Sequence, residues 1–216
     1  MLFRSEDSNL SRRYVTRILK NVTVKESPKW LKERIESVGL RSINNIVDVS
    51  NFILMEMNHP NHVFDLNKID GNEIKVKSAG NEDKLVTLDE QERELEDGDI
   101  VICDGKKIIA LGGVMGGLDS EVTENTKNIL LEVAHFNSQN VRKTSRRLTL
   151  SSDSSYRFER GIDVEDSIKV INRLANLIQE VAGGEILNGY VDVYPVPHEN
   201  KLPRSEERRV GKECRS

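Results

Sequence analysis

The sequence predicts an α+β fold with mainly antiparallel sheets and peripheral helices. Two observations support this class. Between Glu73 and Ala134, short strand-like runs alternate with turn residues, and such close spacing favours antiparallel pairing because parallel strands need longer connections. On both sides of this region, apolar residues recur at the spacing of amphipathic helices. A sheet packed on a sheet, with helices outside, fits this pattern.

Before Glu73, the chain is predicted to contain one strand and two helices after a frayed start or linker at residues 1–12. Pro28 suits the first turn of a helix, and Gly39 favours its end. Pro60 should stop the second helix. The predicted strand covers 14–24, and the helices cover 28–39 and 47–57.

From Glu73 onward, five short strands precede two helices and a last strand. The helix at 164–181 is the clearest in the sequence, and Asp163 can cap its start and Gly183 its end. An exit linker at 196–203 follows the last strand. The strands are predicted at 74–76, 84–88, 100–103, 107–111, 129–134 and 185–194, and the helices at 138–147 and 164–181.

Composition limits the classes of function. The sequence contains no run of 18 apolar residues and no signal peptide, so we expect a soluble, cytoplasmic protein without a membrane partner. Its two cysteines, Cys103 and Cys214, cannot build a disulfide framework or a cysteine zinc site, and Cys103 is expected to pack inside a strand. A net charge of −4 argues against nucleic-acid binding by bulk electrostatics.

The last thirteen residues, 204–216, differ from the rest of the chain. They show no apolar periodicity and resemble translated vector sequence, so they are excluded from the predicted fold. This ending and the abrupt start favour a fragment of a longer chain over a free-standing factor that acts in trans.

Two histidines three residues apart, His59 and His62, follow the helix predicted at 47–57. A zinc pair is one interpretation, but zinc sites usually have three protein ligands and no nearby cysteine or second histidine pair supplies them. A hydrogen-bonded histidine in a turn is a purely structural alternative. A neutral imidazole near pH 7 can also position or deprotonate a water molecule.

A glycine turn, Gly112–Gly117, precedes an apolar strand that contains a lone carboxylate, Glu132. The turn lacks the patterns of a phosphate-binding loop and of a dinucleotide fold. It could be a tight connection with positive φ angles, a surface that a ligand approaches closely, or both. Taken alone, Glu132 is more typical of the solvent side of an edge strand.

From Arg13 to Pro195, the order and spacing of these motifs closely resemble the B3/B4 region of the bacterial phenylalanyl-tRNA synthetase beta subunit. The stretches that carry the resemblance are Asn51–Asp65, Gly112–Gly117, Glu132 and Ser152–Gly161. The resemblance implies a domain over 13–195 with three β/β/α layers. It also implies hydrolytic editing, in which tyrosine mischarged on the phenylalanine tRNA is released.

The resemblance also implies the roles of individual residues. Glu132 would recognise the phenolic hydroxyl of tyrosine. His62 and Asn51 would act in catalysis by ordering the water. Ser154 stands where the family often has alanine, which narrows the pocket slightly and adds a polar group. The residues that would shape the pocket are Gly113, Gly116, Ser152 and Ser154.

The family implies further partners and one alternative function. The parent enzyme is an α2β2 ligase of protein biosynthesis whose alpha subunit uses ATP and Mg²⁺, so the partners are that subunit and the phenylalanine tRNA. No cofactor or metal is implied for this chain. The alternative is an RNA-binding or scaffolding module without activity in isolation. The predicted helix at 138–147 supplies the candidate phosphate contacts, Arg142, Lys143, Arg146 and Arg147.

Overall fold

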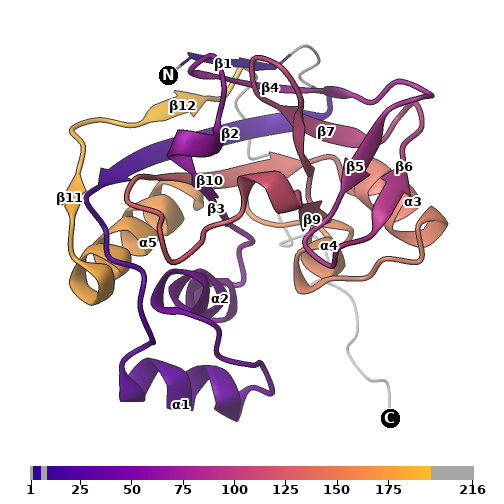
Figure 1. Cartoon of the computed structure of the whole chain (residues 1–216). Coiled ribbons are helices and arrows are strands. Elements are labelled where there is room, and N and C mark those ends of the chain that lie inside the picture. Colours follow the sequence, from indigo (N-terminus) through magenta and orange to yellow (C-terminus); the bar gives the residue numbers. More distant parts are fainter. Residues whose placement is uncertain (1, 6–8, 196–216) are drawn as a thin grey trace, which may run out of the picture.

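Two sheets face each other, and helices cover the outer face of the second sheet (Figure 1). The computed structural model of the protein describes residues 2–5 and 9–195. The predicted exit linker at 196–203, the predicted vector-like tail at 204–216 and Cys214 lie outside these residues. The α+β class with mainly antiparallel sheets is confirmed, and the layers follow the predicted β/β/α order.

The first sheet has the strand order β1-β4-β7-β8-β9, and its pairs are antiparallel except for the parallel pair β1–β4. Residues 2–5, which were predicted as part of a frayed start or linker, form a strand whose backbone pairs with β4. A two-stranded ribbon, β5–β6, lies beside this sheet. The bounds are β1 Leu2–Ser5, β4 Glu73–Ser78, β5 Lys84–Val86, β6 Glu92–Glu94, β7 Ile100–Cys103, β8 Ile108–Leu111 and β9 Met115–Gly116.

The second sheet is built around β10 (Ile129–Phe136), which pairs with β2 (Ser11–Lys20) on one side and with β3 (His62–Asp65) on the other. β11 (Glu185–Ile186) and β12 (Val191–Val193) both pair with β2. The strand predicted at 185–194 is therefore two short strands. The strand predicted at 14–24 begins earlier, at Ser11, and ends earlier, at Lys20.

The helices α2 and α5 pack against the second sheet, α1 packs on α2, and α3 and α4 lie at one end of the two-sheet sandwich. The helix predicted at 164–181 begins at Ser167 rather than Val164, because the Asp163 carboxylate accepts the N–H of Glu165 and forms a turn before the helix. The helix predicted at 138–147 is confirmed. The bounds are α1 Lys29–Ser37, α2 Asn45–Met57, α3 Ser138–Arg147, α4 Asp153–Phe158 and α5 Ser167–Ala182, with 3₁₀ turns at Leu66–Lys68 and Leu118–Ser120.

The side chains of β10 alternate between two cores. Leu131 and Val133 pack with the helices, whereas Leu130 and Ala134 pack between the two sheets. Because successive side chains of a strand point to opposite faces, Glu132 points into the core between the sheets. A carboxylate in that position is costly unless it is paired or protonated, which marks this part of the core as a candidate site.

Within residues 2–5 and 9–195, no helix combines the length and the apolarity needed to cross a bilayer.

Candidate functional site

A cavity of about 60 Å³ lies between the two sheets. Apolar side chains from both sheets and from α4 form most of its wall, and the volume is sufficient for water. Five of the predicted site residues line it: His62, Gly113, Gly116, Glu132 and Ser154. Segments that are far apart in the sequence therefore meet at one place.

Glu132 is the acidic group of this cavity. It lies on the central strand β10, only 4% of its surface is exposed, and its register partner on β3 is His62. The Tyr14 hydroxyl donates a hydrogen bond of 2.8 Å to Oε2 of Glu132. Burial raises the pKa of Glu132 to about 7, although the bond from Tyr14 lowers it in part. The interpretation of Glu132 as a solvent-facing residue on an edge strand is wrong.

His62 begins β3 and faces Glu132 across the sheet. Its ring packs edge-on against Phe64, with the ring centroids 4.4 Å apart. Burial lowers the pKa of His62 to about 4, so the ring is neutral near pH 7. A neutral imidazole can orient a water molecule, but a group with this pKa is a weak general base near pH 7.

Glycine is required at Gly113 and at Gly116 for different physical reasons. A Cβ atom at Gly116 would lie 2.6 Å from Cε1 and 2.9 Å from Nε2 of His62, so only glycine leaves this ring its place. Gly113 has a φ of +74°, and a Cβ there would meet Val141 at 2.8 Å and Phe158 at 3.1 Å. Gly113 therefore serves the tight connection as well as lining the cavity, and Gly116 makes room for the ring of His62.

Ser152 stabilises the start of α4, next to the cavity. It caps α4 in a capping box with Ser155, and its hydroxyl donates to the carbonyl oxygen of Val114 at 2.7 Å. These bonds attach the start of α4 to the glycine turn, and Ser154, two residues further along in α4, lines the cavity. The lining itself does not include Ser152.

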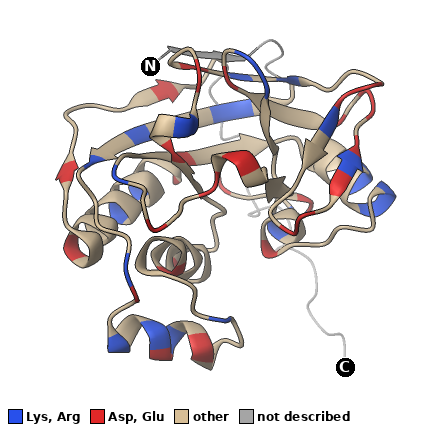
Figure 2. Cartoon of the chain, viewed as in Figure 1, with Lys and Arg blue, Asp and Glu red and all other residues tan. Residues whose placement is uncertain are grey.

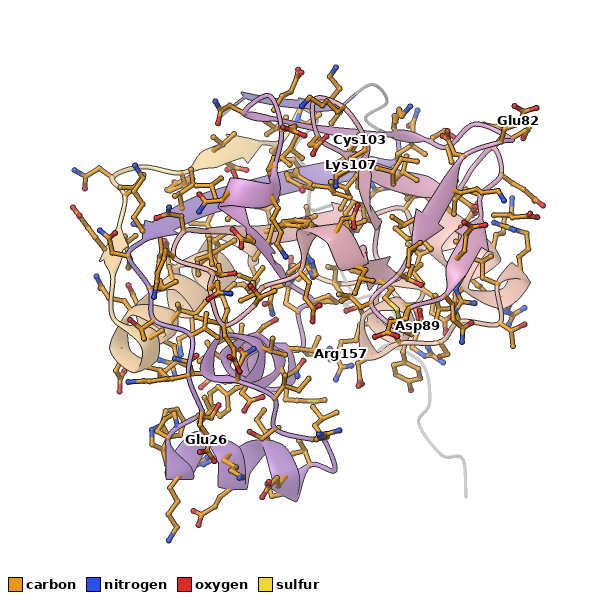
Figure 3. All side chains as sticks on the ribbon, in the orientation of Figure 1. Glu26, Glu82, Asp89, Cys103, Lys107 and Arg157 are labelled. Atoms are coloured by element: carbon orange, nitrogen blue, oxygen red, sulfur yellow. The ribbon has the colours of Figure 1, made fainter. Side chains whose placement is uncertain are left out.

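Arg157 attaches α4 to the loop after α2 (Figure 3). Its guanidinium donates to the side chain of Asn58 at 2.9 Å and to the carboxylate of Asp153 at 3.0 Å. The loop that it holds continues into Pro60 and His62, which line the cavity together with residues of α4. Arg157 thus helps to fix the relative positions of the two walls.

Residues 10–183 match the family model of the B3/4 domain. The chain belongs to the B3/4 domain family.

Similar proteins agree with this assignment, and the resemblance inferred from the motifs is confirmed. The chain is 46% identical over 207 residues to the phenylalanine–tRNA ligase beta subunit of Thermotoga maritima, which covers 96% of this chain and 26% of that protein. It is 53% identical over 180 residues to the beta subunit of Protochlamydia amoebophila, which covers 83% of this chain and 22% of that protein. The chain therefore spans about a quarter of the length of these relatives.

A solved structure shares the fold. It is an N-terminal fragment of the phenylalanyl-tRNA synthetase beta subunit from Pyrococcus horikoshii, with a TM-score of 0.57 and 14% sequence identity. The match covers 89% of this chain and 53% of that one. At this identity, the likeness supports the fold alone.

Asn51, the second predicted catalytic residue, is not part of the cavity lining in this B3/4 domain. It is half-buried on α2, whereas Asn61 lines the cavity one residue before His62. The Asn61 side chain exchanges two hydrogen bonds with Ser50: its Oδ1 accepts from the hydroxyl at 2.8 Å, and its Nδ2 donates to the carbonyl oxygen at 3.1 Å. Asn61 therefore ties the His62 loop to α2.

The basic side chains predicted to contact RNA divide into two groups on α3. Arg147 forms ion pairs with the buried Asp99 and with Glu96, so it is held in place by the protein itself. The other three are exposed on the surface of the helix, and the residues described in the structure offer them no ion pair or hydrogen bond. They are Arg142, Lys143 and Arg146. Figure 2 shows basic segments of the ribbon in blue on α3.

His59 is a buried residue of the turn after α2. Only 2% of its surface is exposed, and its Nδ1 lies 3.0 Å from the carbonyl oxygen of Pro60. Across the two described ranges, no group of three or more His, Cys, Asp or Glu side chains could hold a metal ion. The interpretation of His59 and His62 as a zinc pair therefore lacks further ligands in that part of the chain.

Proposed function

We propose that this B3/4 domain is an editing site that hydrolyses the ester between tyrosine and the phenylalanine tRNA, as part of a phenylalanine–tRNA ligase. The observation that carries the proposal is a buried carboxylate, Glu132, which opens into a cavity with mostly apolar walls. A phenol can donate a hydrogen bond to this group. The benzyl side chain of phenylalanine cannot.

The selectivity follows from an asymmetry between two kinds of pocket. An apolar pocket that synthesises Phe-tRNA cannot strongly reject an analogue that only adds a hydroxyl, because the hydroxyl costs little there. A pocket that contains an acceptor can make the reverse choice. If phenylalanine enters, it excludes water from Glu132 and leaves Oε1 of the carboxylate without a donor, which costs about 1–3 kcal/mol or more for a charged group. The domain should therefore bind the tyrosyl ester preferentially.

In hydrolysis, a water oxygen attacks the ester carbonyl carbon and the bond to the ribose oxygen breaks. One proton of the water ends on that ribose oxygen, so the products are tyrosine and free tRNA. The neutral ring of His62 would orient the water rather than remove its proton completely, since the pKa of His62 is about 4. The neighbouring ribose hydroxyl of the substrate could then assist the proton transfer.

The direct test is single-turnover deacylation by the 216-residue chain in excess over the phenylalanine tRNA charged with either tyrosine or phenylalanine. We expect the Tyr ester to disappear faster than the Phe ester. Asn51→Ala should retain more activity than His62→Ala, because Asn51 is not in the lining. No hydrolysis of either ester by a folded chain would contradict the proposal and favour a scaffolding module.

Gly116→Ala should reduce Tyr-tRNA hydrolysis at least about tenfold while the fold survives. The new methyl group would contact the far end of the His62 side chain, which can rotate away at modest energetic cost. What is lost is the position of the ring. Hydrolysis rates report the loss, and the chemical shift of the His62 Cε1 proton reports the displacement.

Gly80→Ala is the matched control for this substitution. The three atoms nearest to a Cβ at Gly80 all belong to the Asp83 side chain, the closest at an ordinary contact distance of 3.6 Å, and Gly80 does not line the cavity. It should leave both readouts unchanged. Full activity in a folded Gly116→Ala protein would show that the ring of His62 has no role in the reaction.

A further inference from the structure

Tyr14 is buried behind the cavity and was not among the predicted site residues. Only 1% of its surface is exposed, and it pairs with Ala134 of β10, two residues from Glu132. Residues two apart on a strand share a face, so Tyr14 and Glu132 are diagonal neighbours across the β2–β10 pair. The Tyr14 ring also packs edge-on against Phe136, with centroids 6.4 Å apart.

The hydrogen bond from Tyr14 distinguishes the two oxygens of Glu132. Oε2 accepts from the Tyr14 hydroxyl at 2.8 Å, and this is the hydrogen bond that the Glu132 side chain makes within the described part of the chain. The carboxylate therefore cannot rotate freely, because rotation would break a buried bond to a charged group. Oε1 is the oxygen left for a ligand that enters the cavity.

We propose that Tyr14 is the positioning residue of the editing pocket: its hydroxyl holds Oε2 of Glu132 and keeps Oε1 as an ionised acceptor for the substrate's phenol. This inference rests on the proposed function for the identity of the substrate. The bond itself does not depend on it. Tyr14 thus supplies, from within the protein, one of the two donors that the carboxylate needs when tyrosine is bound.

The charge state of Glu132 supports this role. The Tyr14 bond opposes the burial that raises the pKa of Glu132 to about 7. The other titratable group that faces the carboxylate is His62 on β3, which is neutral because burial lowers its pKa. The first sheet faces the cavity with apolar residues such as Ile102 and Ala110. Of the described residues, Tyr14 is therefore the one that favours the ionised form.

The test is Tyr14→Phe, which removes the hydroxyl and keeps the ring. In the 216-residue chain with ¹³C-labelled glutamate, the titration midpoint of the Glu132 carboxyl should rise by roughly one to two pH units, as expected for the loss of a hydrogen bond to a charged acceptor. Near pH 7, the preference for the Tyr ester should fall about tenfold. It should recover as the pH is raised, which a merely structural defect would not do.

Thr16→Val is the matched control. Thr16 is also buried on β2 and is the direct register partner of Glu132, but it makes no described hydrogen bond to the carboxylate. It should leave the midpoint and the ester preference unchanged. An unchanged midpoint in a folded Tyr14→Phe protein would overturn the inference. A raised midpoint, in a chain whose wild type shows no Tyr preference, would support the positioning role and refute the proposed function instead.

Discussion

Glu132→Ala should lower the ratio of Tyr-tRNA to Phe-tRNA hydrolysis by about 10- to 100-fold. A hydrogen bond to a charged group is worth about 1.5–3 kcal/mol, and each 1.4 kcal/mol corresponds to a factor of ten. Both effects of the carboxylate disappear in the variant: the phenol loses its acceptor, and the Phe ester no longer leaves a carboxylate oxygen without a donor. The expected change is therefore in discrimination, with faster hydrolysis of the Phe ester as well as slower hydrolysis of the Tyr ester.

The measurement is a pair of single-turnover rates for each variant at one pH. Glu132→Gln should retain part of the preference, because an amide oxygen still accepts a hydrogen bond but carries no charge. Asp65→Asn is a control for the removal of a buried carboxylate, since Asp65 lies on β3 outside the cavity lining and accepts from Thr126. If Glu132→Ala kept the wild-type ratio, another group would have to read the hydroxyl.

The sequence could predict the elements that are long and periodic. α3 matches its prediction, and α5 is found near its predicted place. The four-residue β3 was not predicted, because it follows Pro60 directly and is too short to show alternation. β1 was missed because its partner, β4, is far along the chain, and periodicity carries no information about such pairing.

The candidate site also has a part that the sequence predicts and a part that only the fold shows. The family resemblance predicted five of the residues that line the cavity. Alternation in β10 places Glu132 on the face opposite Val133. The Tyr14–Glu132 bond joins residues 118 positions apart and depends on the register of β2 against β10, which only the fold provides. Asn51 was selected by the motif alone, whereas the chain reversal after α2 brings Asn61 into the lining.

The second large effect expected is on stability. Compared with Glu132→Gln, the wild-type chain should lose roughly 2–3 kcal/mol of unfolding free energy between pH 5 and pH 8. The pKa of Glu132 is raised from 4.5 to about 7 in the folded protein, so between these values the folded state binds more protons than the unfolded state. Stability must then fall as the pH rises through this window, because unfolding lets the carboxyl ionise in water.

Denaturant unfolding of both proteins at several pH values tests this expectation. The two stability curves should converge near pH 4.5 and separate up to about pH 8, beyond which their difference should stay constant. In the Tyr14→Phe background, the separation should continue to higher pH, since the bond that favours the ionised form is absent. Parallel curves across the whole range would mean that Glu132 titrates as it does in water.

This stability effect also suggests a functional reason for a carboxylate, Glu132, in the core between the two sheets. A buried carboxylate with a single hydrogen-bond donor, Tyr14, in the core between two sheets makes the fold less stable at the pH at which it would work, and an apolar residue at this position of β10 would pack with Leu130 and Ala134. The same desolvation that weakens the fold strengthens the preference for a ligand that can donate to Glu132. If the two effects have this common origin, the preference for the Tyr ester should reach half of its limit near pH 7, where the stability difference begins to level off.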